Sequence, residues 1–165
     1  MIVALSPPVA SVVIFLAKWA LAGPALLVLY DIVCRREWHR DIIAGTVSGI
    51  ATVALTKISG ALYVHARPFV AFHVAPLITH VADNAFPSDH LAACGLAVGF
   101  LWTRSRVLAI AALTFALALG AARVLARLHW PVDIVGGFAE GLIGSAVGYF
   151  VEMRLSQAMS RSKRP

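Results

Sequence analysis

The sequence predicts an all-α bundle of about five transmembrane helices, on the strength of its composition and the arrangement of its charges. Of the 165 residues, 60% are hydrophobic and 13% are charged, a balance far from that of soluble domains. The charged residues gather in short clusters between long apolar runs. At this length we expect residues 1–165 to form a single integral-membrane domain in contact with the bilayer.

Five apolar runs supply the predicted spans, since about 20 apolar residues are enough for a helix to cross a bilayer. Gly23 and Pro24 interrupt the first run and are expected to kink it, which neighbouring helices tolerate. The runs are, in chain order, Pro8–Val33, Asp41–Tyr63, Leu91–Trp102, Val107–Ala122 and Val132–Val151.

The third predicted span is short. From Ser88 to Trp102 a helix covers roughly 22 Å at 1.5 Å per residue, less than the ~30 Å hydrocarbon core. Its first turn is therefore expected near or below the outer interface, within reach of a lipid headgroup, unless a tilted or longer neighbour covers the deficit.

Basic residues divide unevenly between the two sides of the predicted bundle. One side receives nine lysines and arginines, and the other receives four: Lys57, Arg67, Arg123 and Arg127. The positive-inside rule then places the C-terminus in the cytoplasm and the N-terminus outside. Although the net charge of +6 is compatible with nucleic-acid binding, these short clusters form no basic face, and no nucleic-acid partner is expected.

The connection between the fourth and fifth runs, RVLARLHWPVD, is unusually polar for this chain. His129 and Asp133 are four residues apart, so on a helix the carboxylate reaches the imidazole and fixes its tautomer. Arg123 and Arg127 offer guanidinium forks of the kind that bind phosphate. Taken alone, this segment fits a phosphate site and a topology-setting basic cluster equally well.

A second cluster, NAFPSDH, ends where the third run begins. Ser88 is a natural N-cap, so the backbone N–H groups of Asp89 and His90 would point outward and attract an anion. A plain capped helix start explains Ser88 as well. His90 favours the functional interpretation, because two histidines at one pocket can divide phosphoryl transfer between a nucleophile and a general acid.

With Lys57 and the segment HARPF at residues 65–69, these clusters resemble the three-part signature of the type 2 phosphatidic acid phosphatase family, which shares its site with vanadium-dependent haloperoxidases. That signature is a lysine, a spacer and Arg-Pro, then Pro-Ser-Gly-His, then Ser-Arg, five residues, His, three residues and Asp. The motifs extend from Lys57 to Asp133. Within the family, residues 66–90 are most similar to bacterial undecaprenyl-diphosphatases of the bacitracin-resistance type.

The resemblance implies a role for each residue of the motifs. His129 would attack phosphorus and form a phosphohistidine, Asp133 would orient it, and His90 would protonate the leaving lipid oxygen. The phosphate would be held by Lys57, Arg67, Ser88, the backbone N–H of Asp89, and Arg123. Outside the motifs, Arg127 follows Arg123 by four residues and is expected either to contact a second phosphate or to meet lipid headgroups or water. The family works without a metal, so no cofactor is expected.

Three positions depart from the family pattern. Asp89 stands where the family has glycine, which brings a carboxylate next to an anion site and requires its side chain to point away or the backbone to differ. Ala122 replaces the serine before the arginine. Nine residues, rather than six, separate Lys57 from Arg67.

The histidines of the polar segment between the second and third runs invite a metal-site interpretation. His65, His73 and His80, taken with Asp83, match no trusted ligand spacing, and interfacial histidines are common. No metal site is expected there.

The sequence thus predicts a hydrolase of the bacterial cytoplasmic membrane, with its site facing the periplasm or exterior. Its expected substrate is an isoprenoid lipid diphosphate, most simply undecaprenyl diphosphate, whose hydrolysis would recycle the carrier lipid of cell-wall synthesis and raise bacitracin tolerance. Alternatives are a phosphatase for phosphatidate, phosphatidylglycerophosphate or a lipid A phosphate, and a non-catalytic protein that binds or transports lipid phosphates.

Overall fold

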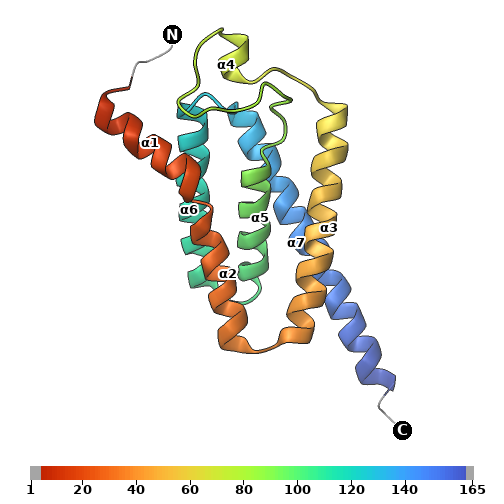
Figure 1. The fold of residues 1–165 in the computed structure, drawn as a ribbon. Coiled ribbons are helices and arrows are strands. Elements are labelled where there is room, and N and C mark those ends of the chain that lie inside the picture. Colours follow the sequence, from red (N-terminus) through yellow and green to blue (C-terminus); the bar gives the residue numbers. More distant parts are fainter. Residues whose placement is uncertain (1–4, 163–165) are drawn as a thin grey trace.

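A computed structural model describes residues 5–162, and these form a helical bundle with no strand among them (Figure 1). An isolated bridge pairs Ala66 with Asn84. The helices are α1 (Pro7–Trp19), α2 (Ala22–Arg35), α3 (Trp38–Leu62), α4 (Pro68–Ala71), α5 (Asp89–Trp102), α6 (Arg106–Leu125) and α7 (Pro131–Ser162).

The predicted all-α membrane bundle is confirmed. Within the described residues, four helical stretches are long and apolar enough to cross a membrane: 7–35, 38–62, 106–125 and 131–160. The third predicted span corresponds to α5, which has only 14 residues and is not among these four. It stands at the centre of the bundle, in contact with α2, α3, α6 and α7. Three of these neighbours, α3, α6 and α7, are longer than α5.

The first predicted span is broken into α1 and α2, as the Gly23–Pro24 pair predicted. Proline has no N–H, so Pro24 cannot donate to the carbonyl of Ala20. That carbonyl instead accepts from the N–H of Gly23 at 3.2 Å. The last bond of the α1 ladder runs from Ala20 to the carbonyl of Leu16, so the carbonyl of Ala17 lies beyond the ladder and is free for another donor.

The ends of two helices differ from the sequence-based boundaries. Helix α6 continues to Leu125 and so includes Arg123, which the hydropathy pattern placed in a connection. Helix α7 continues past Val151 to Ser162, because Arg154, Ser156 and Gln157 are compatible with a helix outside an apolar environment. The basic tail residues Lys163 and Arg164 lie outside the described residues.

Glycines let α7 approach its neighbours closely. A Cβ added at Gly141 would collide with the backbone of Ala92 and Leu96 in α5, and one added at Gly144 would collide with Thr52 in α3. Small residues at helix interfaces permit this packing in membranes. The glycines at positions 141 and 144 of the fifth predicted span therefore serve helix packing.

Replacing Gly141 by alanine is expected to lower the free energy of unfolding by about 1–3 kcal/mol, because the new methyl group overpacks a backbone contact. The measurement is the thermal unfolding of the detergent-purified protein. Gly45→Ala in α3 is the matched control, since a Cβ there meets nothing within 4 Å. Equal behaviour of the two variants would contradict the close-packing interpretation.

At the end of the bundle near the C-terminus, ion pairs join several helices (Figure 1). Arg104, after α5, contacts Asp41 of α3 at 2.5 Å and Asp31 of α2 at 3.5 Å. Arg40 contacts Glu152 of α7 at 2.6 Å. Some of the arginines that predict the orientation of the chain therefore also fasten α2, α3 and α7 to one another.

Candidate active site

The three sequence clusters meet at the opposite end of the bundle, where the α3–α5 connection lies over the α6–α7 connection (Figure 1). The Phe69 N–H donates to the carbonyl of Arg127, and the Ser88 N–H donates to the carbonyl of Asp133. A cavity of about 320 Å³ lies between these segments. Six of the predicted site residues line it: Lys57, Arg67, Asp89, His90, Arg123 and His129.

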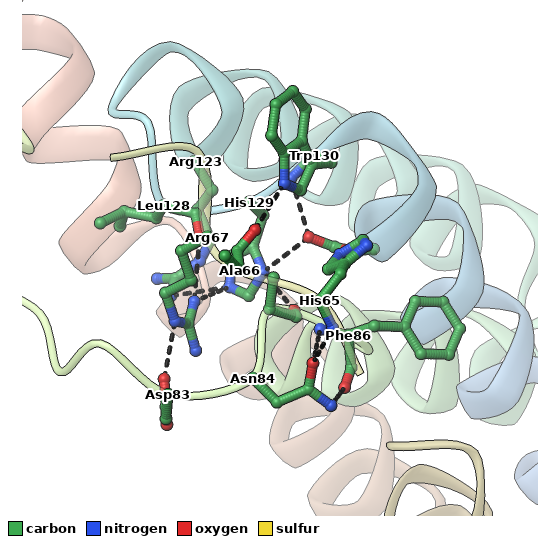
Figure 2. Close-up of polar contacts among 12 residues, drawn as sticks. His65, Ala66, Arg67, Asp83, Asn84, Phe86, Arg123, Leu128, His129 and Trp130 are labelled. Atoms are coloured by element: carbon green, nitrogen blue, oxygen red, sulfur yellow. Dashed lines mark hydrogen bonds and ion pairs between the residues drawn. The ribbon is translucent and has the colours of Figure 1, made fainter. Parts of the chain in front are cut away.

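His129 is buried in the wall of this cavity, with only 3% of its surface exposed. Its Nδ1 lies 2.9 Å from the carbonyl oxygen of Ala85. Because a carbonyl only accepts hydrogen bonds, Nδ1 carries the hydrogen and the neutral ring keeps its lone pair on Nε2. Nε2 lies 3.2 Å from Nη1 of Arg67 and 3.4 Å from Nη2 of Arg123 (Figure 2). The nucleophilic lone pair is thus directed between two guanidinium groups.

Burial lowers the pKa of His129, since it disfavours the charged ring. The charges of Arg123 and Arg67 lower the pKa further, while the contacts with Asp133 and with the Ala85 carbonyl raise it. The net effect of these contributions is that the pKa of His129 lies below its usual value, so the ring is neutral near pH 7. A neutral imidazole with a free Nε2 is the form that attacks phosphorus.

The pH dependence of kcat/KM should reflect this lowered pKa. Attack requires neutral His129, so kcat/KM is expected to fall on the acidic side as the pH drops through the pKa of His129 in the folded protein. Loss of the proton from the donor His90 sets the basic side of the profile. Because the pKa of His129 lies below the ordinary value of about 6.5, the acidic limb of the profile should lie below pH ~6.5. Measuring kcat/KM on a short-chain lipid diphosphate between pH 4 and 8 tests this expectation. An acidic limb above pH 6.5 would contradict it.

Asp133 is fully buried next to His129, but its contacts differ from the prediction. Its Oδ2 lies 3.5 Å from Nδ1 of His129, farther than the Ala85 carbonyl. Its closer partners are His65, whose Nε2 lies 2.8 Å from Oδ1, and the backbone N–H of Trp130, 2.8 Å from Oδ2. His129 and Asp133 do not share one continuous helix, because α7 begins only at Pro131.

Arg67 is held on two sides. Its Nε donates to Oδ1 of Asp83 at 2.7 Å, and its Nη1 donates to the carbonyl of Leu128 at 3.0 Å (Figure 2). Partial burial raises the pKa of Asp83, but the hydrogen bond and charge of Arg67 outweigh it and keep that pKa below its usual value. Asp83 is therefore ionised at neutral pH and fixes the guanidinium beside His129.

Arg123 owes its position to the break in the first span. Its Nη1 donates to the carbonyl of Ala17, which lies past the end of the α1 ladder, at 3.4 Å. Its Nε is buried and has no acceptor in the described part of the chain. An oxyanion in the cavity is a suitable acceptor for a donor of this kind.

Ser88 occupies the N-cap position of α5, as predicted. It is fully buried, but its side chain makes no capping bond, and its Oγ has no partner within residues 5–162. Asp89 is exposed and His90 is half-buried, and both line the cavity. The first backbone N–H groups of α5 have no intrahelical acceptor, so the anion site implied by the resemblance is geometrically available at Asp89.

Lys57 lines the cavity, whereas Arg127 lies outside it. Lys57 is exposed on α3 and lines the cavity despite the longer spacer before Arg67. Arg127 adopts a left-handed φ of 65°, and its Nη1 donates to the carbonyl of Ala75 at 3.0 Å. It does not line the cavity. The geometry gives Arg127 a role in fastening the α3–α5 connection, and its contact with a second phosphate remains a prediction.

Sequence reasoning assigned no function to four groups that the structure brings to the site. These are the carbonyl of Ala85 and the side chains of His65, His80 and Asp83. A backbone carbonyl leaves no signal in a side-chain pattern. The other three lie in the polar segment before Ser88, whose density of ionisable groups between two spans is the signal that they share.

Comparison with known protein families matches residues 50–156 to the PAP2 superfamily, and this range includes every predicted site residue. The chain belongs to the PAP2 superfamily. The resemblance read from its motifs is confirmed, and the protein is a lipid phosphatase, a hydrolase of the membrane.

Two curated relatives in the PAP2 superfamily carry undecaprenyl-diphosphatase names. Undecaprenyl-diphosphatase BcrC of Bacillus subtilis (strain 168) is 30% identical over 81% of this chain and 69% of its own. Putative undecaprenyl-diphosphatase YbjG of Escherichia coli (strain K12) is 29% identical over 84% of this chain and 71% of its own. A lipid A 1-phosphatase of Rhizobium johnstonii is 36% identical, but over 47% of this chain and 32% of its own.

Solved structures of the PAP2 superfamily share the fold. A transmembrane PAP2 type phosphatidylglycerolphosphate phosphatase from Bacillus subtilis superposes with a TM-score of 0.65 at 18% identity, over 95% of this chain and 81% of its own. Aquifex aeolicus LpxE superposes with a TM-score of 0.63 at 19% identity, over 88% of this chain and 87% of its own. At these identities the likeness concerns the fold alone.

Proposed function

We propose that this PAP2 phosphatase hydrolyses an isoprenoid lipid diphosphate, most simply undecaprenyl diphosphate to undecaprenyl phosphate and phosphate. The observation that carries the proposal is the buried, neutral His129, whose Nε2 lone pair lies between Arg67 and Arg123. Relatives named undecaprenyl-diphosphatase cover most of the chain, which favours this substrate over a lipid A phosphate.

The proposed reaction has two steps. Nε2 of His129 attacks the terminal phosphorus while the bond from that phosphorus to the bridging oxygen breaks, and His90 gives its proton to the departing lipid phosphate. Water then attacks the phosphohistidine, His90 takes a proton from it, and the P–N bond breaks to release inorganic phosphate. Arg67 and Arg123 stabilise the charge on the non-bridging oxygens in both steps.

Orientation and physiological role extend the proposal. The nine-to-four division of basic residues supports a site facing the periplasm or exterior of a bacterial cytoplasmic membrane. Undecaprenyl phosphate released there would be recycled as the carrier lipid for peptidoglycan synthesis, and bacitracin tolerance would rise as a consequence. A fluorescent protein fused after Pro165 should lie in the cytoplasm, and a periplasmic location of that reporter would contradict the orientation.

The substrate is tested by comparing kcat/KM of the purified protein on undecaprenyl diphosphate, farnesyl diphosphate, phosphatidate and phosphatidylglycerophosphate. The proposal predicts preference for the two diphosphates and activity that persists in EDTA. A higher kcat/KM on phosphatidate or phosphatidylglycerophosphate would contradict the proposal that the substrate is an isoprenoid diphosphate. Phosphate release that chelation abolishes and added metal restores would overturn the metal-independent mechanism.

A further inference from the structure

A third histidine, His80, belongs to the cavity that holds His129 and His90. It comes from the connection between α4 and α5 and is half-buried. The centroid of its ring lies 6.4 Å from that of His129, with the two planes inclined at 78°. His73 lies in the same connection but is exposed and is not part of the cavity wall.

One edge of the His80 ring is fixed by the backbone. Nδ1 lies 3.1 Å from the carbonyl oxygen of Val81, which can only accept, so Nδ1 carries a hydrogen. Nε2 makes no hydrogen bond within the described residues. When the ring is protonated, Nε2–H is therefore a charged donor available to a ligand in the cavity.

The cavity wall around His80 carries more positive than negative charge. Its charged side chains are Lys57, Arg67, Asp83, Asp89 and Arg123, and Asp83 is already paired with Arg67. An anion in this cavity therefore meets a cationic surface.

His80 and His129 border the same cavity, in which a phosphoryl group would lie. An atom under attack lies about 3–3.5 Å from its nucleophile, so the oxygens on phosphorus extend from Nε2 of His129 into the space that His80 borders. A transferring phosphoryl group spreads its charge over three equatorial oxygens. Arg67 and Arg123 approach Nε2 of His129, and His80 can supply a further donor.

We propose that His80 is a further phosphate-binding residue, whose Nε2–H donates to a non-bridging oxygen of the phosphoryl group that His129 attacks and then carries. This inference rests on the phosphoryl site of the proposed function and adds to it a residue from outside the three motifs. An uncharged hydrogen-bond donor of similar length at position 80 should therefore restore part of the phosphate binding.

The test uses the full-length protein in detergent and three variants: His80→Ala, His80→Gln and His73→Ala. Binding of inorganic phosphate is measured by calorimetry, kcat/KM is measured on farnesyl diphosphate, and thermal unfolding reports folding. His80→Ala is expected to weaken phosphate binding and to lower kcat/KM by about tenfold or more, as loss of a charged donor does. His80→Gln should recover much of both quantities, and His73→Ala should stay within about twofold of the parent chain, since an exposed substitution away from the site has little effect.

Three results would overturn the assignment. The first is phosphate binding and turnover of His80→Ala equal to those of the parent. The second is a loss in His80→Gln as large as that in His80→Ala, and the third is the same loss in His73→Ala. Phosphate binding also separates this inference from the proposed function. If the parent chain hydrolyses no lipid phosphate but binds inorganic phosphate in a His80-dependent manner, the proposed function fails and the role of His80 stands.

Discussion

Replacing His129 by alanine is expected to lower kcat for lipid diphosphates by about 10⁴-fold or more, because the chain then lacks the group that forms the covalent intermediate. The ring is buried against the carbonyl of Ala85, and Nε2 is directed into the cavity. No other described histidine has its Nε2 within hydrogen-bonding distance of both guanidinium groups. The measurement is phosphate release from undecaprenyl or farnesyl diphosphate by the purified variant.

Loss of folding must be separated from loss of chemistry in that variant. His129 contacts the α3–α5 connection through the carbonyl of Ala85 and the guanidinium of Arg67, so some loss of thermal stability is expected of His129→Ala as well. His129→Gln keeps a polar side chain of similar length without the nucleophilic ring and should be equally inactive. If either variant is folded and releases phosphate at the parent rate, His129 is not the nucleophile.

Arg123→Ala is expected to lower kcat/KM by about 10²–10³-fold, the usual effect of removing one preorganised donor from a developing oxyanion. The side chain is buried, its Nη2 lies beside His129, and its Nε has no protein acceptor among residues 5–162. Arg123→Lys should recover only part of the activity, because a single ammonium cannot reproduce the planar fork of donors.

Arg127→Ala is the matched control for Arg123. The two arginines are four residues apart, but Arg127 bonds to the carbonyl of Ala75 rather than lining the cavity. Arg127→Ala should therefore keep kcat/KM within about tenfold of the parent while lowering the thermal unfolding midpoint, since it loses a hydrogen bond that closes the connection. A loss of kcat/KM as large as that of Arg123→Ala, specific to diphosphates, would instead establish the predicted second phosphate contact.

The helical bundle was predictable because a segment that crosses the bilayer must be helical, apolar and about 20 residues long. The short third span is the most informative case. Its 14-residue helix places Ser88 beside the start of α7, where its N–H donates to the carbonyl of Asp133. The interruption of the first span near Gly23–Pro24 was predictable because proline removes one bond from the helix ladder. The hydrogen bond from Arg123 to the carbonyl of Ala17, at the end of α1, was not predictable.

Which residues form the site could be predicted better than the contacts that they make. Motif spacing named His129, Arg67 and Arg123, and the fold brings them together. The carboxylate of Asp133 lies 3.5 Å from Nδ1 of His129, but the carbonyl of Ala85 lies closer, at 2.9 Å, because Pro131 starts a new helix between the two residues. Contacts of this kind depend on how segments far apart in the sequence cross, which a linear pattern does not encode.

The central claim is that phosphate passes through His129. The direct measurement is rapid quenching of the purified protein with farnesyl diphosphate labelled with ³²P on its terminal phosphate, followed by mapping of the labelled peptide. We expect an acid-labile, alkali-stable label on His129 that forms within one turnover, decays as phosphate is released, and is absent from His129→Ala. A label on another residue, or full turnover by the parent chain with no labelled protein at any quench time, would contradict the account.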